Sequence, residues 1–534
     1  MKNPKRHSGD QVSRQSSLID GFVRRTPQTP GGNSFSKSRP QPSLSVDDFK
    51  RPEGLMPRDR SSNSTIPDGT ATGRKSIYKQ ELNMDDDKRR KPKESKHRVR
   101  RFLSKSTSMI MMSLILASGF LVGTAYLRAT QIFQGGSTAL ALNDELDPNK
   151  LKGEGDGRVN ILMLGRGGDG HTAPDLTDTI MIASVDPIQK DAGLLSIPRD
   201  FYVQLPNGGG SMKINSVYAN SKNYAISQGK SEKAAQAIGI KAVEQTVESI
   251  IGIPIHYHVM VDFSGFEKAV NTVGGVDINV KKPVYEQMVI RNKPYTLDVP
   301  VGKQHFNGFR ALAYSRSRYT SPRGDFDRSE RQRQILVALR EKVFTLGTFG
   351  NPIKMAQLMD NFGKHVQTNL SLNDLTQIYN LAGDITGDKV KSVGLADPPN
   401  SYVTTGFVDN QSVVLPRAGL NVYTEIQSYI RNTFKDGFIR KENPKLLVLN
   451  GTPNAGLATL QKAVLKSYGY KVSGIGDAPS KNYRNSVLID LRNGEKKYTK
   501  RYLELRYKTN AIADLPRGID PGNADFVIIL GSVL

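Results

Sequence analysis

The chain has 534 residues, which is too long for a single hydrophobic core and therefore predicts two or more domains. It contains no cysteine, so disulfide bonds and thiolate metal sites are excluded. The formal net charge is +24, but residues 1–105 supply +13 of it, with 25 Lys and Arg against 12 Asp and Glu, so the charge alone does not indicate a nucleic-acid-binding fold.

Residues 1–105 are rich in Ser, Pro, Asn, Gln, Lys and Arg and show no hydrophobic periodicity. Such a segment buries too little apolar surface to offset the entropy of ordering, so it predicts a disordered tail. Residues 88–101 hold nine basic side chains in fourteen. That run is either a nucleic-acid-binding patch or, next to a membrane, a topology signal that attracts anionic lipid.

Residues 106–127 carry no charge over 22 positions, which is long enough for a helix to span a bilayer. Basic residues crowd the N-terminal flank, whereas only Arg128 follows closely on the other side. The positive-inside rule therefore predicts a single-pass anchor with a cytoplasmic tail and an extracytoplasmic remainder. Residues 128–157 are interpreted as a polar extracytoplasmic linker.

Residues 158–345 alternate between strand-like and helix-like patterns. Strands are predicted at 159–165, 179–186 and 192–198, and a strand–helix–strand unit at 257–280. This alternation predicts an α/β domain with a central sheet flanked by helices. Residues 346–443 are interpreted as a mainly helical connector, and residues 444–534 as a smaller α/β domain with the order strand–helix–strand–strand–helix–strand.

Residues 314–334 contain six arginines and no lysine. The guanidinium group presents a planar fork of donors that matches phosphate oxygens in a bidentate manner, which lysine cannot do. Asp325 stands where a helix N-cap would, and a helix is predicted from there to about Phe344. Followed toward the N-terminus, the apolar stripe of this helix continues into Gln332 and Arg328. A buried guanidinium needs an anionic partner, so an anion is expected at this end of the helix. The alternative is a solvated, arginine-rich helix start.

Three other segments carry candidate polar groups. Asp178 stands at the entrance of a buried strand, where a carboxylate suits a hard cation, although a turn or cap role is the alternative. Arg199 and Asp200 follow a strand, where ligands of α/β sheets gather, or where a simple loop ion pair forms. Lys213 precedes a predicted helix and carries little specificity alone.

Taken together, a carboxylate, several arginines and no Ser-His-Asp or Cys-His set indicate phosphoryl chemistry, which depends on positioning and charge stabilisation. The glycine run at 165–170 lacks the Lys and Ser or Thr of a P-loop and the spacing of a dinucleotide fingerprint, so both are rejected.

In this order, the motifs NILMLG, LTDTIM, LLSIPRD, KIN, ALAYSRSRY and DFDRSERQRQ resemble the LytR-CpsA-Psr family over about residues 158–345. Residues 444–534, with VLNGTPNAGLA and DFVIILG, resemble the LytR C-terminal domain. The resemblance implies an extracytoplasmic phosphotransferase. Such enzymes move a glycopolymer, such as a teichoic acid, from a polyprenyl diphosphate carrier onto peptidoglycan.

The resemblance also implies roles for individual residues. Asp178, Arg199, Arg316, Arg318 and Arg328 are the implied catalytic residues. The diphosphate would be bound by Arg199, Lys213, Arg316, Arg318, Arg328, Arg331 and Gln332. Asp178 and Asp169 would hold magnesium or manganese, and either Asp178 or Asp200 would serve as general base. The polyprenyl tail would occupy an apolar cavity between sheet and helices.

Two positions depart from the family pattern. Leu176 stands where the family commonly has an arginine, so one phosphate contact is either missing or replaced, with Arg166 as the candidate substitute. The first acidic ligand of the family usually follows the opening LG closely, whereas this chain has LGRGGDG, so Asp169 is the nearest candidate and Asp175 the next.

Two other functions stay open at this point. The same site could deliver water, which would make the protein a polyprenyl diphosphate hydrolase. Alternatively the protein is a non-enzymatic, membrane-bound transcriptional or envelope regulator that uses its basic tail. The predicted membrane helix separates that tail from the arginines of 316–333, so no specific nucleic-acid partner is expected.

Overall fold

The computed structural model describes residues 139–142, 146–206, 208–291, 293–319, 321–345, 363, 365–399 and 401–533. The predicted tail at 1–105, the predicted membrane helix at 106–127 and the first part of the predicted linker lie outside these residues. Within the described ranges, no helix combines the length and the apolar character needed to cross a membrane.

A six-stranded mixed sheet forms the centre of the larger α/β domain, in the order β11-β6-β1-β2-β3-β12. β1 pairs in parallel with β6 and antiparallel with β2, and β2 pairs antiparallel with β3. The predicted α/β class is therefore confirmed, and the first three predicted strands are neighbours in one sheet. The strands are β1 Val159–Arg166, β2 Thr177–Asp186, β3 Asp191–Ser196, β6 Tyr257–Asp262, β11 Val366–Thr368 and β12 Val390–Gly394.

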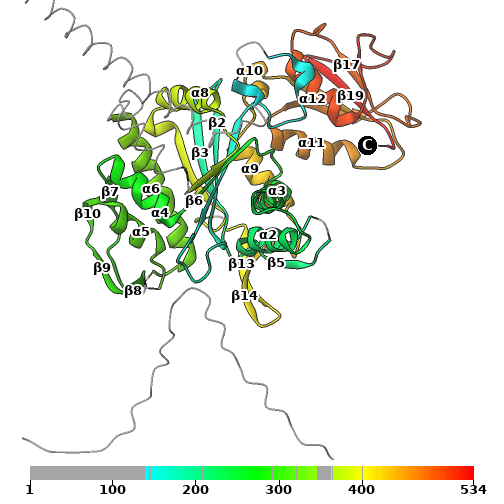
Figure 1. Ribbon diagram of the computed structural model, residues 1–534. Coiled ribbons are helices and arrows are strands. Elements are labelled where there is room, and N and C mark those ends of the chain that lie inside the picture. The colour runs from blue at the N-terminus through cyan, green and yellow to red at the C-terminus, as the bar shows by residue number, and fades with distance from the viewer. Residues whose placement is uncertain are drawn as a thin grey trace, which may run out of the picture. The chain divides into compact units, whose positions relative to one another are not determined.

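Helices cover both faces of this sheet (Figure 1). Alternation along β1 sends Leu162 and Leu164 to one face, where they pack with Val243 and Val247 of α3. Met163 and Gly165 point to the opposite face. The first face carries α2 Val217–Ser227, α3 Glu232–Ile251 and α9 Thr424–Thr433, and the second carries α4 Phe263–Thr272, α5 Gly308–Arg316, α6 Asp325–Thr345 and α8 Leu372–Gly383.

Four pairs of strands lie outside the central sheet. The predicted strand at 276–280 is β7, but it pairs with β10 rather than with β6, so the predicted strand–helix–strand unit does not lie in one sheet. Its buried side chains, such as Ile278, pack with α5 and α6. The pairs are β7 Val276–Val280 with β10 Gly302–Phe306, β8 Val284–Ile290 with β9 Lys293–Val299, β4 Tyr202–Gln204 with β5 Ser211–Lys213, and β13 Val403–Val408 with β14 Gln411–Pro416. Short 3-10 turns are η1 Leu140–Leu142, η2 Pro148–Lys150, η3 Ile214–Ser216 and η5 Gly387–Lys389.

The described part of residues 346–443, which were predicted as a mainly helical connector, holds four strands as well as α8, α9 and α10 Gly437–Glu442. Two of those strands, β11 and β12, are the outer strands of the central sheet. The larger domain therefore continues past the predicted boundary at 345. The two outer strands are short, with three and five residues, and such edge strands carry too few alternating positions for a clear pattern.

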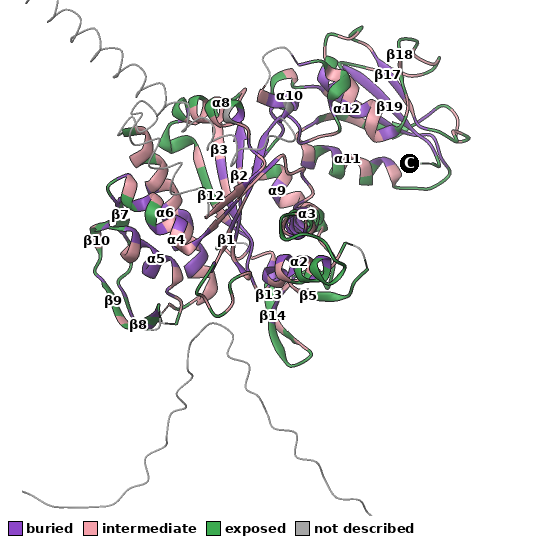
Figure 2. Ribbon diagram, viewed as in Figure 1, coloured by how far each residue is buried: buried purple, intermediate pink, exposed green. Residues whose placement is uncertain are grey.

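The C-terminal domain is a five-stranded sheet in the order β16-β15-β19-β17-β18. Every predicted element of this domain is present, and the short strand β18 is an addition. Figure 2 shows that β19 is buried, and all five of its residues lie in the core. The elements are β15 Lys445–Asn450, α11 Leu457–Tyr468, β16 Lys471–Asp477, β17 Val487–Asp490, α12 Lys497–Tyr507, β18 Ala511–Ile512 and β19 Phe526–Leu530.

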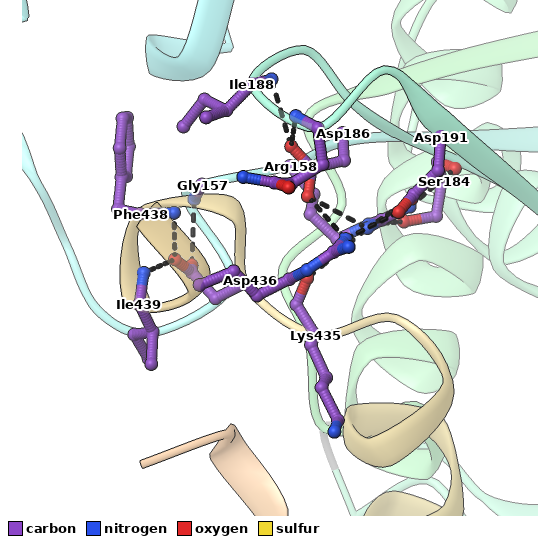
Figure 3. Close-up of polar contacts among 12 residues, drawn as sticks. Gly157, Arg158, Ser184, Asp186, Ile188, Asp191, Lys435, Asp436, Phe438 and Ile439 are labelled. Carbon is purple, nitrogen blue, oxygen red and sulfur yellow. Dashed lines mark hydrogen bonds and ion pairs between the residues drawn. The ribbon is translucent and has the colours of Figure 1, made fainter. Parts of the chain in front are cut away.

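A buried polar cluster joins the start of β1, the β2–β3 turn and the segment before α10 (Figure 3). Asp436 caps α10 through Oδ1, which accepts from the backbone N–H groups of Phe438 and Ile439. Its Oδ2 accepts from the backbone N–H groups of Gly155 and Gly157 at 2.8 and 2.9 Å, and from the Tyr502 hydroxyl of α12 at 3.1 Å. One carboxylate thus ties three distant segments together.

Replacing Asp436 with alanine is expected to lower the free energy of unfolding by about 2–4 kcal/mol, because a helix cap is lost and buried donors are left without acceptors. Asp436→Asn keeps one acceptor oxygen for the helix cap but turns a donor toward Gly155 and Gly157, so an intermediate loss is expected. Chemical denaturation measures both, with exposed Asp514→Ala as the control. Equal stability of Asp436→Ala and the wild type would contradict the role of the Asp436 hydrogen bonds in holding these segments together.

Candidate functional site

Asp178 occupies a β-bulge in β2. In the pairing of β1 with β2, Gly165 lies opposite Thr179 and Arg166 lies opposite Thr177, so Asp178 is the extra residue. Bulges of this kind turn a side chain out of the regular alternation and leave a backbone carbonyl free of the ladder. The carboxylate of Asp178 is directed toward Asn215 and Arg199, on the α2 side of the sheet.

Two buried arginines converge on Asp178 from different elements. The NH1 atom of Arg199, just after β3, donates to Asp178 Oδ1 at 2.8 Å. The NH2 atom of Arg328, in the first turn of α6, donates at 3.2 Å to the Asp178 carbonyl oxygen that the bulge frees. Arg199 and Arg328 are only 6% and 5% exposed. The structure thus brings together three predicted site residues that lie up to 150 positions apart.

Asp325 is the acidic partner of these arginines. It was predicted as the N-cap of α6, but the helix begins at Asp325 itself. Its Oδ1 lies 2.7 Å from Arg328 NH2 and 3.5 Å from Arg199 Nε. A buried guanidinium needs such a partner, so the residue is placed by charge pairing rather than by helix capping.

The Arg328 side chain has donor capacity left over. Burial lowers the pKa of its guanidinium from the usual value, and the Asp325 carboxylate acts in the opposite direction. Within the described residues, Arg328 Nε is buried and makes no hydrogen bond. An orphaned donor on a desolvated cation is costly, and an anionic ligand would satisfy it.

Arg316 and Arg318 lie at the C-terminal end of α5. The guanidinium carbon of Arg316 lies 5.0 Å from the ring centre of Phe263. Arg318 lies over Tyr319 and donates to its hydroxyl at 2.6 Å. Arg318 also acts electrostatically on Arg328, so the two belong to one basic cluster. We name Arg199, Arg316, Arg318 and Arg328 the arginine cluster.

An apolar cavity of about 340 Å³ lies between the sheet and α4, α5, α6 and α8. Its walls come from β1, β2 and β6 on one side and from helices on the other, and they are almost entirely aliphatic or aromatic. Representative wall residues are Met163, Met181, Val259, Phe266, Ala269, Leu312, Ile335, Leu336 and Leu339. The cavity matches the one that the sequence resemblance implied, and its place between sheet and helices could not be read from the sequence.

Three of the five polar residues in the cavity wall adjoin Asp178 or the arginine cluster, and the other two are Asp262 and Thr368. Thr179 directly follows Asp178, and Ser315 directly precedes Arg316. Gln332 lies one helical turn after Arg328, and its amide donates to the Ser315 carbonyl at 3.3 Å. The site therefore combines an apolar chamber with a cationic rim, which suits an amphiphile with a phosphorylated head.

Arg331 and Lys213, which were predicted to bind the diphosphate, have other partners, and Asp169, a predicted metal ligand, is exposed. Arg331 donates to the carbonyl oxygens of Tyr314 and Ser317 and to the Ser321 hydroxyl, so its contacts hold the α5–α6 connection rather than facing the cavity rim. Lys213 pairs with Asp200 at 3.0 Å, beside Arg199. Asp169 is exposed in the loop between β1 and β2.

Sequence reasoning missed two members of the site. The Nδ2 atom of Asn215 donates to Asp178 Oδ1 at 3.4 Å, and the residue stands in the quoted KIN motif beside Lys213. Phe263, which lines the cavity and lies under Arg316, begins α4 after Asp262 caps it. An aromatic at a helix start carries no sequence signal for this role, because helix cores hold many such residues.

The donor set is compatible with a magnesium ion shared with a phosphorylated ligand. Magnesium is commonly bound by one or two carboxylates while substrate phosphates and water complete its shell. Asp178 offers one carboxylate at the rim. In the part of the chain that the structure describes, no group of three or more His, Asp or Glu side chains forms a site made of protein alone.

Sequence comparisons relate this chain to known proteins. Residues 443–532 match the model described as LytR cell envelope-related transcriptional attenuator. A polyisoprenyl-teichoic acid–peptidoglycan teichoic acid transferase, TagU of Enterococcus faecalis, is 30% identical over 249 residues, 46% of this chain and 73% of TagU. The cell wall biosynthesis protein LcpA of Corynebacterium glutamicum is 29% identical over 353 residues, 61% of this chain and 64% of LcpA.

Among solved structures, TagV of B. subtilis matches with 26% identity and a TM-score of 0.39, covering 52% of this chain and 97% of TagV. The model of the LytR_cpsA_psr family matches residues 128–415, more than half of the chain. The chain therefore belongs to the LytR-CpsA-Psr family.

Proposed function

We propose that this protein transfers a glycopolymer from a polyprenyl diphosphate carrier onto peptidoglycan. The proposal is supported by the similarity of this chain to TagU, which is a polyisoprenyl-teichoic acid–peptidoglycan teichoic acid transferase. The observation that carries it is the junction of an apolar cavity with a rim of buried arginines. A polyprenyl phosphate has this same division into an apolar tail and an anionic head.

In the proposed complex, the polyprenyl tail occupies the cavity and the diphosphate lies against the arginine cluster. Arg199 and Arg328 approach from the Asp178 side, while Arg316 approaches from the end of α5 above Phe263. Bidentate guanidinium contacts fix the orientation of each phosphate as well as neutralising its charge. Arg328 Nε, a buried donor without a hydrogen bond in the described structure, would gain an acceptor.

The transfer itself breaks one P–O bond and forms another. A hydroxyl of the acceptor attacks the phosphorus that bears the glycopolymer, and polyprenyl phosphate leaves with the bridging oxygen. The hydroxyl proton passes to a carboxylate at the rim, either Asp178 or Asp200. A magnesium or manganese ion held by Asp178 would supply further neutralisation of the diphosphate oxygens. Arg199 and Arg328 stabilise the charge that develops on the departing phosphate.

The remaining parts of the chain are assigned in the same proposal. Residues 106–127 would anchor the protein in the cell membrane once, with residues 1–105 in the cytoplasm and residues 128–534 outside, where carrier lipid and peptidoglycan meet. The basic run at 88–101 would attract anionic lipid. The C-terminal domain would act as a binding or targeting module.

The first test is mass spectrometry of lipid extracted from the full-length protein, purified in detergent from a host that makes polyprenyl lipids. We expect a bound polyprenyl phosphate or diphosphate, and we expect it to be lost when Arg316 and Arg318 are both changed to alanine. Arg417→Ala, on an exposed ion pair with Glu425, is the matched control. A lipid-free wild type, or equal lipid in the double variant, would count against the site.

Product analysis then separates transfer from hydrolysis. Purified enzyme, labelled lipid-linked glycopolymer and peptidoglycan should yield a covalent glycopolymer–peptidoglycan product together with polyprenyl phosphate. Release of free glycopolymer phosphate at the same rate with and without peptidoglycan would instead assign a hydrolase. Addition of a chelator should lower the rate if a divalent ion takes part.

A further inference from the structure

A second, larger concavity lies on the opposite face of the sheet from the apolar cavity. It has a volume of about 890 Å³ and is lined by the β1–β2 loop, by α2 and α3, by β6 and by residues 366–369. Along β1, Gly165 lines the apolar cavity whereas the next residue, Arg166, lines this groove. We name this feature the polar groove.

The polar groove begins close to Asp178. Lys222 on α2 binds Asp175 at 2.9 Å and Glu232 at 2.7 Å, and Asp175 also binds Arg166 at 2.7 Å. Asp175 precedes Asp178 by three residues, and α2 begins two residues after Asn215, which contacts the Asp178 carboxylate. The polar groove therefore begins beside Asp178, on the side of the sheet to which the Asp178 carboxylate is directed.

The charges of the polar groove cancel, which distinguishes it from the arginine cluster. Its lining holds four cations, Arg166, Lys222, Lys233 and Lys241, and four anions, Asp169, Asp175, Glu232 and Glu244. Burial alone would lower the pKa of Lys222, but hydrogen bonds to Asp175 and Glu232 outweigh it and raise the pKa, so this cation is retained. A groove without net charge does not select a polyanion, and its polar walls do not suit a lipid tail.

The walls of the polar groove alternate donors and acceptors. The amide of Gln367 donates to the Gln236 amide oxygen at 3.0 Å, and His258 Nδ1 lies 2.8 Å from a Glu244 oxygen. Amides both donate and accept, and sugar hydroxyl and acetamido groups do the same. The groove is large enough for a ligand of several hundred Å³, within the usual range for bound small molecules.

We propose that the polar groove binds the saccharide segment that lies next to the reacting phosphate. This inference rests on the proposed transferase function and extends it to the sugar part of a substrate. Two substrates contain such a segment, namely the glycopolymer of the lipid carrier and the glycan strand of peptidoglycan. Arg166, held by Asp175, forms the near end of the groove and stands close to Leu176, where the family commonly has an arginine.

The test uses the full-length protein in detergent and measures KM for each substrate separately. Gln236→Trp places an indole in the groove, and Gln367→Ala removes the amide pair. Gln411→Trp, an exposed change outside the groove, is the matched control. The donor is a polyprenyl diphosphate that carries one disaccharide, and the acceptor is a four-sugar peptidoglycan glycan fragment. Thermal melting verifies that each variant is folded.

If the groove holds the acceptor, KM for the glycan fragment should rise at least fivefold in Gln236→Trp, while KM for the lipid donor and kcat stay near wild type. If it holds the donor glycan, the rise should appear in KM for the donor instead. Unchanged values for both substrates in folded Gln236→Trp would overturn the proposal.

A separate binding measurement distinguishes failure of the groove from failure of the transferase function. Calorimetric titration of the four-sugar fragment, and of the free disaccharide, requires no catalysis. Binding by the wild type that Gln236→Trp abolishes would support the groove even if no transfer is observed. Absence of binding of both saccharides to the wild type would overturn the proposal while leaving the lipid test above unaffected.

Discussion

Arg328→Ala is expected to lower the transfer rate by roughly 10³-fold or more. Arg328 is a buried guanidinium that touches the Asp178 carbonyl and pairs with Asp325, and in the described structure its Nε makes no hydrogen bond. Removing one preorganised group that stabilises developing charge costs about 10²–10³ in rate. Truncating one partner of a buried ion pair adds the cost of an uncompensated carboxylate, here Asp325.

The same change should also lower stability, so the measurement needs a variant that keeps the charge. Arg328→Lys retains a cation near Asp325 but loses the planar fork. It should therefore restore most of the free energy of unfolding while transfer stays about 10²-fold below wild type. Steady-state transfer assays and chemical denaturation of the two variants provide both readouts. Near-normal transfer by folded Arg328→Lys would mean that Arg328 supplies charge alone.

Arg333 is the matched comparison, because it is an equally buried arginine on the same helix. Its guanidinium binds Asp397 at 2.7 Å and the hydroxyl groups of Ser196 and Ser392, so it joins α6 to β3 and β12. Arg333→Lys should lower stability with a smaller effect on transfer per folded molecule. The contrast between Arg328 and Arg333 tests whether burial alone explains a loss of activity.

The sequence predicted the regular elements well where one physical pattern dominated. The strands at 159–165 and 257–262 are mostly apolar, and they are neighbours in the interior of the sheet. The strand β7 was also predicted, but its pairing with β10 was not. Alternation along one strand shows which side chains are apolar, but it does not show which strand is the hydrogen-bonded neighbour. The edge strands β11 and β12 were missed because they are short and half-exposed.

The sequence predicted which residue types would make up the candidate site, but not how they are arranged in space. The excess of arginine over lysine near α6 predicted an anion site, and the structure brings Asp178, Arg199 and Arg328 together. Arg331 lies only three residues from Arg328 and looks the same in sequence, but it turns to backbone carbonyls. Three residues along an α-helix rotate a side chain by about 300°, so the two arginines point in directions about 60° apart. The carbonyl that Arg328 reaches belongs to a bulge at Asp178 that no local pattern reveals.

Ala269→Phe should empty the apolar cavity of lipid while leaving the fold intact. Ala269 lies on α4 and lines the cavity of about 340 Å³, so a benzyl side chain at this position would occupy space otherwise open to the polyprenyl tail. Displacing one isoprene unit of five carbons loses about 4 kcal/mol, at about 0.8 kcal/mol per buried carbon. At about 1.4 kcal/mol per tenfold, lipid affinity should fall several hundredfold.

Arg328→Ala should lower stability, whereas Ala269→Phe should leave stability unchanged or raise it. The new ring adds apolar contacts in an open cavity rather than overpacking a filled core, so the melting temperature should stay unchanged or rise. Ala463→Phe, on the exposed surface of α11, is the matched control. Quantifying co-purified polyprenyl lipid and transfer in both variants tests the cavity directly. A stable Ala269→Phe protein that still binds lipid and transfers glycopolymer would place the lipid tail outside this cavity, and the arginine cluster would then need another explanation.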